Sequence, residues 1–284
     1  KKLLDISNDV LIMDEVGNLN DSFTMNKIYK SSPFMINFCE EIVNQSINPK
    51  KINFLFQTLI KSLYRNKDLW NVKINNDEYV KSKNLILSSS LIAHPRCLEI
   101  MGIDSLPLRD ALTIGQDKVV DSLLQKTTKL TYIKRKIYIF HVSNHSVVFK
   151  FNYNYLQILF SKLITENLSF EKIIFQIQSD GSMILVLHCI YKYQLADMNI
   201  ENIVESLKSL FINYPKFLDL ILEARLIDNM NWRASQPSSN LLSKELQWSE
   251  KSNIGFCGDW FKWKNCGGVE SAMNSSIRLS QLLN

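Results

Sequence analysis

Near the C-terminal end of the chain, glycines and acidic residues are spaced so that they could hold a ligand. The apolar run that starts at Ile254 ends in Gly258-Asp259, and Gly267-Gly268 precede a helical pattern over Val269–Leu283. A helix N-terminus has unpaired N–H groups and a partial positive charge, which suit an electron-rich or anionic group. Glycine lets a ligand touch the backbone, and an Asp at a strand end can accept hydrogen bonds from sugar-like hydroxyls. Gly-Asp alone, however, favours an ordinary strand–turn–helix with an Asp cap.

Other arrangements that carry chemistry are missing from the sequence. It contains no Ser-His-Asp or Cys-His pattern, and it identifies no catalytic acid or base. His141 and His145 are four residues apart but lie in a β-like region, where helical ligand spacing does not apply, so we expect no metal site.

The full stretch from Ile254 to Ala272 indicates a function more specifically than its glycines alone. It resembles the flavin motif of the FAD-dependent amine oxidase superfamily, and within that superfamily the renalase branch. The resemblance implies that Asp259 binds the ribityl or pyrophosphate part of FAD. It also implies that the N–H groups near Val269 face the N1/O2 edge of the flavin and stabilise the anionic reduced form. The matching residues, which we expect to bind the cofactor, are Gly258, Asp259, Trp260, Gly268, Val269, Glu270 and Ala272.

Two further stretches resemble the same family. Residues 56–60, with Trp70-Asn71-Val72 and Leu85–Ser89 after them, match a run in which the residue equivalent to Ile60 pairs its backbone with adenine. Packing explains a β-branched residue there equally well. Trp232–Pro237 resembles a renalase segment, which implies substrate contacts: Trp232 near the isoalloxazine and Arg233 as an anion contact. A packed aromatic residue with a surface neighbour is the alternative.

One motif of the family has no counterpart in this sequence. The G-x-G-x-x-G that cradles the pyrophosphate is missing, since no two glycines before residue 255 stand at a spacing of two. The chain also begins with Lys1-Lys2 rather than Met. We therefore expect the numbering to start after roughly the first 60–70 residues of a family member, the part that holds this motif.

The order of the elements predicts a mixed α/β (α+β overall) fold. It consists of a discontinuous, Rossmann-like FAD-binding domain with an inserted β-rich substrate domain. The expected segments are 1–30 (substrate domain), 31–90 (FAD-binding domain), 91–251 (substrate domain) and 252–284 (FAD-binding domain).

Within these segments, apolar periodicity and turn residues predict individual elements. We expect helices over 31–48, 155–165, 200–213 and 269–283. We expect strands over 52–56, 59–64, 69–74, 79–80, 85–87, 134–142, 146–151, 172–178, 183–193 and 253–257, and one within 218–233. The strand Leu85–Leu87 is expected to be buried on both faces because it is continuously apolar.

Composition narrows the class of protein. The chain has 284 residues, 46% of them hydrophobic, and a formal net charge of +5 with interspersed lysines. Disorder is excluded, and we expect no nucleic-acid partner. No apolar stretch approaches the length of a membrane span. The five Cys residues are scattered, which is typical of reduced thiols, and we expect a cytoplasmic protein. The oligomeric state stays open.

Together these features predict an FAD-dependent, renalase-like oxidoreductase. It would transfer a hydride from a small substrate to flavin and on to O2. By the resemblance, that substrate is NAD(P)-derived, a dihydronicotinamide isomer. The alternatives are a flavin amine oxidase or desaturase acting on a larger hydrophobic substrate, and a flavin-less descendant that serves as a scaffold.

Overall fold

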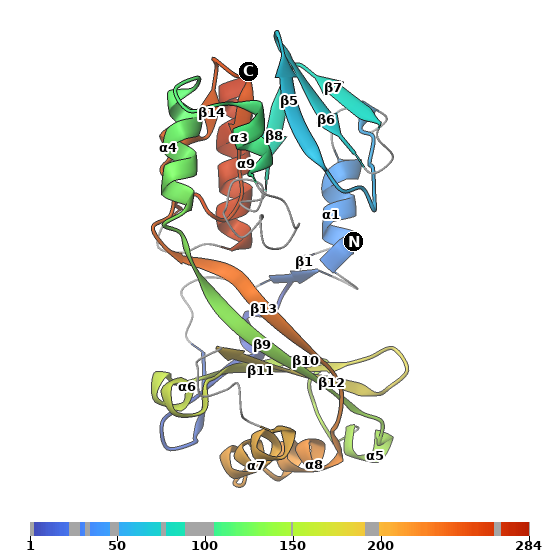
Figure 1. Cartoon of the computed structure of the whole chain (residues 1–284). Coiled ribbons are helices and arrows are strands. Elements are labelled where there is room, and N and C mark those ends of the chain that lie inside the picture. The colour runs from blue at the N-terminus through green and yellow to red at the C-terminus, as the bar shows by residue number, and fades with distance from the viewer. Residues whose placement is uncertain are drawn as a thin grey trace. The chain divides into compact units, whose positions relative to one another are not determined.

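The computed structural model describes residues 3–22, 29–31, 35–45, 51–74, 78–88, 105–148, 150–190, 199–263 and 268–283. The chain divides into two compact units. Unit 1 comprises Lys1–Asn53 and Lys134–Arg233, and unit 2 comprises Phe54–Ile133 and Ala234–Asn284. Two long strands, β9 (Thr131–Val142) and β13 (Arg225–Ser239), run from one unit into the other along the chain (Figure 1).

A seven-stranded mixed sheet forms the centre of unit 1, in the order β13-β9-β12-β11-β10-β2-β3. The pairs among β9, β12, β11 and β10 are antiparallel, and β10 pairs with β2 in parallel. The strands besides β9 and β13 are β2 (Val10–Met13), β3 (Leu19–Asp21), β10 (Tyr155–Phe160), β11 (Phe170–Ile177) and β12 (Met183–Ile190). A separate pair contains β1 (Leu3–Asp5) and β4 (Tyr29–Ser31).

The helices of unit 1 are short, and several begin at side chains that cap them. Asn199 accepts a hydrogen bond from the backbone N–H of Asn202 (2.8 Å) at the start of α7. Pro215 opens α8, where a missing N–H costs nothing. The helical elements are η1 (Ser7–Asp9), α1 (Met35–Asn44), α5 (His145–Val148), α6 (Lys162–Leu168), α7 (Ile200–Leu210) and α8 (Pro215–Glu223).

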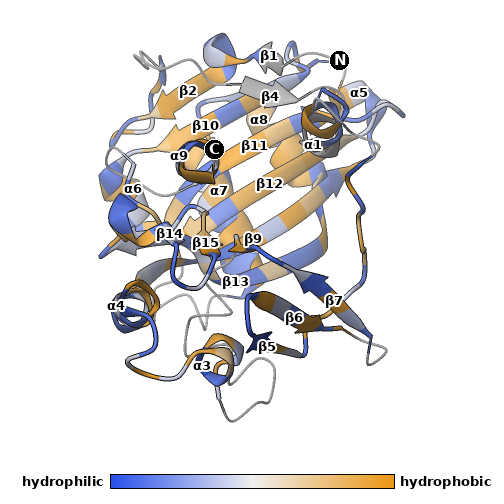
Figure 2. Ribbon diagram, turned by 90° about the horizontal axis from the view of Figure 1, so that it is seen from above, coloured by the Kyte–Doolittle hydropathy of each residue, from blue (hydrophilic) through white to orange (hydrophobic). Residues whose placement is uncertain are grey.

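The two faces of this sheet differ in burial. Alternate residues of β10, β11 and β12 are buried and pack against α7 and α8, which lie together on one side of the sheet (Figure 1). The core there is aromatic: the ring of Phe175 lies 5.6 Å from that of Phe151, 6.3 Å from Phe211 and 5.2 Å from Phe217. The intervening residues are only partly buried and form the opposite face. Figure 2 shows that these central strands are rich in apolar residues.

Unit 2 is built from two three-stranded sheets and helices around one core. One sheet is an antiparallel meander, β5-β6-β7, and the other has the order β14-β15-β8. Trp70 in β6 is fully buried, and its indole N–H donates to the carbonyl of Ser252 (2.8 Å). The elements are β5 (Ser62–Asn66), β6 (Leu69–Lys73), β7 (Tyr79–Ser82), β8 (Leu85–Leu87), α3 (Pro107–Ala111), α4 (Lys118–Thr127), η5 (Lys244–Leu246), β14 (Trp248–Ser249), β15 (Ile254–Phe256) and α9 (Val269–Leu283).

The observed units differ from the expected segments. Residues 105–133 and 234–251 belong to unit 2 rather than to the segment that holds the large sheet, and residues 31–53 belong to unit 1. The reason is packing: Leu108 in α3 and Leu123 in α4 are buried in the same core as Trp70 and Phe256. Changes in the helix and strand patterns along the sequence do not reveal such contacts.

Two predicted elements of unit 1 are wrong. Residues 155–165, expected as one helix, are strand β10 followed by helix α6; the side chains of β10 alternate between half-buried and buried, the period of a strand. Residues 146–151, expected as a strand, include the helical turn α5, where the Asn144 side chain accepts from the N–H of Ser146 (3.1 Å). The strand expected within 218–233 is confirmed as β13, which begins at Arg225, whereas residues 218–223 belong to helix α8.

In unit 2, two predictions also need correction. Residues 52–56 form no strand, and residues 51–57 are exposed. Strand β8 is not buried on both faces, since the Ile86 side chain is 47% exposed. Leu87 is buried, but the side of β8 that carries Ile86 is only half covered by the described residues. The hairpin β11–β12, the buried strand β15 and the helices α7 and α9 are confirmed, apart from Tyr191–Tyr193, which lie outside the described residues.

Two of the cysteines can be compared with the expectation of reduced thiols. Cys189 and Cys257 are buried free thiols, and burial raises the pKa of Cys189 to about 12. Such a thiol carries almost no reactive thiolate at neutral pH.

Of the helices that the structure describes, none is both long enough and apolar enough to cross a bilayer.

The aromatic core of unit 1 gives a stability prediction. Replacing Phe175 with Ala should lower the free energy of unfolding by about 3–5 kcal/mol, because it opens a cavity among three aromatic rings. Tyr153→Ala is the matched control: Tyr153 also contacts Phe151, but its side chain is 38% exposed. The control should cost well under half as much in urea unfolding followed by circular dichroism; equal losses would contradict this account of the core.

Candidate functional site

The candidate site of unit 2 starts where two parallel strands end. Strand β15 pairs in parallel with β8, with Phe256 opposite Leu87, and the N–H of Cys257 continues the ladder by donating to the Leu87 carbonyl (3.1 Å). Ligands of open α/β sheets bind at the carboxyl ends of such strands. Gly258 and Asp259 therefore lie at the edge of the sheet where binding is expected.

Gly258 occupies a position that only glycine fits. Its φ is +138°, which side chains of L-residues rarely adopt. A Cβ there would lie 2.8 Å from the carbonyl oxygen of Ser88 and would collide with the indole ring of Trp260. The glycine is thus required by the close approach of two groups, the Ser88 carbonyl and the Trp260 ring, whether or not a ligand is bound.

A serine that the sequence analysis did not single out holds this turn against helix α9. The Ser275 hydroxyl accepts from the N–H of Gly258 (2.8 Å) and lies 2.9 Å from the Gly258 carbonyl oxygen. Gln247 reinforces it, since its side-chain amide donates to the Ser275 carbonyl (2.7 Å). All three residues are buried. The available signal was helical spacing: Ser271, Ser275 and Leu279 lie four residues apart on the buried face of α9.

The carboxylate of Asp259 can still accept hydrogen bonds. Its side chain is partly buried, and burial raises the pKa of its carboxyl. Among the described residues its only hydrogen bond is to its own backbone N–H. A half-buried carboxylate that lacks a cation or an outside donor is costly, and a ligand with hydroxyl donors would relieve that cost.

The start of α9 combines a glycine at positive φ with an exposed valine. Gly268 has a φ of +113°, and its carbonyl accepts the first helical hydrogen bond, from the N–H of Ala272 (2.9 Å). Val269 is 68% exposed. The carboxylate of Glu270 accepts from the indole N–H of Trp263 (3.2 Å) and lies in the first turn, where the helix dipole favours negative charge.

Two predicted cofactor residues pack in the core of unit 2. Trp260 is only 1% exposed, and its indole N–H donates to the Cys257 carbonyl (2.7 Å), so it stabilises its own turn. Ile60 is partly buried, packs against the hydrophobic core and precedes strand β5, which begins at Ser62. For both residues the structure supplies a packing role; their contacts with a cofactor stay predictions.

The predicted substrate residues belong to the other unit. Trp232 and Arg233 lie in β13 and are exposed, Trp232 to 49%. Their role in substrate binding stays a prediction.

A cavity of about 960 Å³ lies elsewhere in unit 2, lined by residues from the start of α4, from η5 and β14, and from the end of α9. None of the predicted site residues lines it. Its polar residues include Asp117, whose carboxylate caps α4 by accepting from the N–H groups of Val119 (2.9 Å) and Val120 (3.1 Å).

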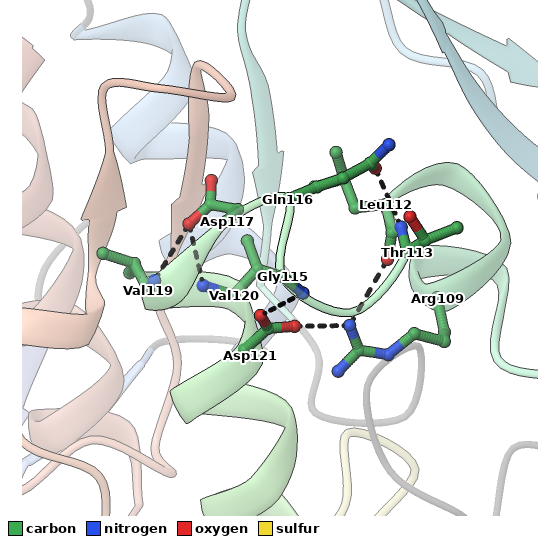
Figure 3. A network of polar contacts seen from close by, with 9 residues as sticks. All are labelled: Arg109, Leu112, Thr113, Gly115, Gln116, Asp117, Val119, Val120 and Asp121. Atoms are coloured by element: carbon green, nitrogen blue, oxygen red, sulfur yellow. Dashed lines mark hydrogen bonds and ion pairs between the residues drawn. The ribbon is translucent and has the colours of Figure 1, made fainter.

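Figure 3 shows this cap beside a second closed network. There Asp121 accepts from Arg109 (2.6 Å) and from the N–H of Gly115 (2.8 Å). Arg109, Asp117 and Asp121 each have hydrogen-bond partners within this region, and these bonds stabilise the connection between α3 and α4. The part of the chain that is described contains no group of three or more His, Cys, Asp or Glu side chains able to hold a metal ion.

Gly258 gives a prediction with an internal control. Gly258→Ala should destabilise unit 2 by roughly 2–5 kcal/mol, because left-handed strain and a steric clash add. Gly115 also has a positive φ (+87°), but nothing lies within 4 Å of the Cβ it would gain. Gly115→Ala should therefore cost only about 1–2 kcal/mol, the strain alone. Thermal and urea unfolding of both variants measures the difference; similar losses would show that close approach at Gly258 is unimportant.

No protein-family model and no curated protein sequence matches the chain. Solved structures, by contrast, do match the chain. A flavoprotein/dehydrogenase from Cytophaga hutchinsonii aligns with a TM-score of 0.50 at 8% identity, covering 98% of this chain and 62% of its own length. An oxidoreductase from Methanosarcina mazei has a TM-score of 0.48 at 12% identity, covering 80% of this chain and 49% of its own. Tetracycline destructase Tet(51) has a TM-score of 0.44 at 12% identity, covering 98% of this chain and 64% of its own.

The chain thus spans between about half and two thirds of the length of these structures. The likeness to the Cytophaga hutchinsonii protein concerns the fold. It agrees with the mixed α/β class that the sequence predicts, in which both units are discontinuous in sequence. The chain has a mixed α/β fold of the kind seen in that flavoprotein/dehydrogenase.

Proposed function

We propose that the protein is an FAD-dependent oxidoreductase, renalase-like, which takes a hydride from a small substrate and passes the electrons to O2. One observation carries the proposal. The half-buried Asp259 carboxylate, bonded among the described residues only to its own backbone, stands at the carboxyl ends of parallel strands. The fold shared with a flavoprotein/dehydrogenase supports it.

The residues present fit the hydroxyl-rich part of FAD. A carboxylate accepts hydrogen bonds and repels a pyrophosphate, so Asp259 suits the ribityl hydroxyls better than the phosphates. Gly258 leaves no side chain in the way at the strand end. The proposed cofactor set also includes Ile60, Trp260, Glu270 and Ala272, which would act through the shape of the site and its backbone groups.

The start of α9 fits an electron-rich ring edge. The N–H groups after Gly268 belong to the positive end of a 15-residue helix, and Val269 beside them is exposed. These groups would stabilise negative charge that develops on a ring held against them. When bound, FAD would supply the hydride acceptor, which the side chains of this protein do not provide.

For the substrate we propose a small, NAD(P)-derived molecule, a dihydronicotinamide isomer. Trp232 would stack against its ring, and Arg233 would contact an anionic group. Both side chains are exposed on β13, Trp232 to 49%. A cytoplasmic location is part of the same proposal, since dinucleotides are abundant there.

The cofactor proposal predicts a spectrum. The purified full-length protein, incubated with FAD and freed of excess by gel filtration, should retain absorption bands near roughly 375 and 450 nm. Reduction by a dihydronicotinamide in the absence of O2 should bleach the 450 nm band. A protein that stays colourless with added FAD would contradict the proposal and favour a flavin-less scaffold.

Asp259 variants separate binding from stability. Asp259→Ala should weaken FAD retention by about tenfold or more, because a hydrogen bond to a charged group is lost. Asp68→Ala is the control, since the Asp68 side chain is 94% exposed in the same unit and should leave retention unchanged. Unaltered FAD affinity in Asp259→Ala would remove this residue from the site.

Asp259→Asn should also stabilise the cofactor-free protein at neutral pH. Because burial raises the folded-state pKa above 3.8, the native state holds this proton more tightly than the unfolded state. Stability is therefore lost as the pH rises through the window between the unfolded and folded pKa values, and the loss is complete above it. The gain from Asn should vanish below pH of about 3.8, which unfolding at several pH values measures.

A further inference from the structure

The partly buried face of the large sheet in unit 1 contains a polar pair with aliphatic side chains on one side of it and an ion pair near the other. Lys172 in β11 lies directly opposite His188 in β12, and His188 lies opposite Ile137 in β9. Directly opposed residues point to the same face. In the next row Ile174, Val186 and Ile139 are neighbours in the same way. The pair thus has an aliphatic row on one side, and Ile190 with Arg135 on the other.

Among the described residues, the charges around the pair leave the Lys172 ammonium without a neutralising partner of its own. Arg135 and Glu171 form a two-point ion pair, with Nε–Oε2 and Nη2–Oε1 distances of 2.7 and 2.6 Å. Their charges cancel. Lys172 interacts with both only through space, and its ammonium has no hydrogen-bond partner among the residues that the structure describes. The net charge of this group of side chains is therefore +1.

His188 is neutral at physiological pH. Burial and the neighbouring Lys172 charge lower the pKa of its imidazole to about 4. It forms no side-chain hydrogen bond within the described residues, so one ring nitrogen can donate and the other accept. Burial also lowers the pKa of Lys172, which indicates that its ammonium is poorly hydrated.

We propose that Lys172 and His188 bind the carboxylate of a small ligand with an apolar body. A carboxylate matches the single net charge and the two adjacent donors, whereas a phosphate dianion would leave a buried negative charge unpaired. The aliphatic row of Ile139, Ile174 and Val186 would contact the rest of the ligand. This site goes beyond the proposed function and does not depend on flavin.

Hexanoate is a suitable probe, because it joins a carboxylate to an aliphatic chain. Titrated into the full chain at low ionic strength, it should bind saturably by calorimetry and raise the pKa of His188, since a nearby carboxylate favours the imidazolium. The His188 pKa is read from its ring resonances by NMR. Acetate and hexanamide, which lack the chain and the charge respectively, should each bind about tenfold more weakly or not at all.

Variants test the assignment to Lys172. Lys172→Met should abolish hexanoate binding and raise the pKa of His188 in the free protein, because a like charge is removed. Lys136→Met is the matched control: Lys136 is opposite Cys189 in the same sheet and lies over the ring of Tyr138 (5.1 Å), on the other face. It should leave binding unchanged. If Lys172→Met fails to fold, Lys172→Arg takes its place. It keeps the charge and should retain measurable binding.

Three outcomes would overturn the proposal. They are no saturable binding of hexanoate, binding that survives Lys172→Met, or a His188 pKa that does not respond to saturating hexanoate. None of these readouts involves FAD, so failure of the flavin proposal leaves this test intact.

Discussion

The candidate site depends on one contact, the Ser275 hydroxyl against the backbone of Gly258. It accepts from the Gly258 N–H and lies close to the carbonyl of the same residue, so helix α9 is fixed to the turn that follows β15. This turn contains Asp259, and helix α9 begins at Val269, directly after Gly268. The Gln247 amide adds a second link, because it donates to the carbonyls of both Phe256 (3.4 Å) and Ser275 (2.7 Å).

The turn itself shows how tightly a site of this kind is packed. Trp260 fills the space that a side chain at residue 258 would need, and it bonds to the carbonyl of Cys257. Asp259, between two buried residues, is left with a carboxylate that burial disfavours. A protein tolerates such a cost where the group has a task, because stability and function are selected together. The same reasoning applies to the Lys172 ammonium in unit 1.

The two faces of the sheet in unit 1 carry different kinds of side chain. Because successive side chains point to opposite faces, Phe175 and Leu187 enter the aromatic core while Lys172 and His188 lie on the other face. The first face is closed by α7 and α8. The second mixes aliphatic residues with a few polar ones, as small-molecule sites do.

The sequence by itself determined the elements whose local signals agree. Strand β15 and helix α9 follow from a short apolar run, a glycine turn and a long helical period, and the hairpin β11–β12 follows from alternation around Asp180-Gly181. The same signals singled out Gly258 and Asp259. Short apolar runs were ambiguous: Tyr155–Phe160 is too brief for its period to exclude a helix, and packing in the sheet made it a strand.

Only the tertiary structure decided which distant residues meet. It placed α3 and α4 on the core of Trp70, set Ser275 against Gly258, and brought Lys172 beside His188. It also showed that Trp260 is a packing residue, which its place in a motif does not reveal. The physical reason is that local propensity acts over a few residues. Burial, cross-strand pairing and pKa values, by contrast, are set by side chains that the fold brings together from far along the chain.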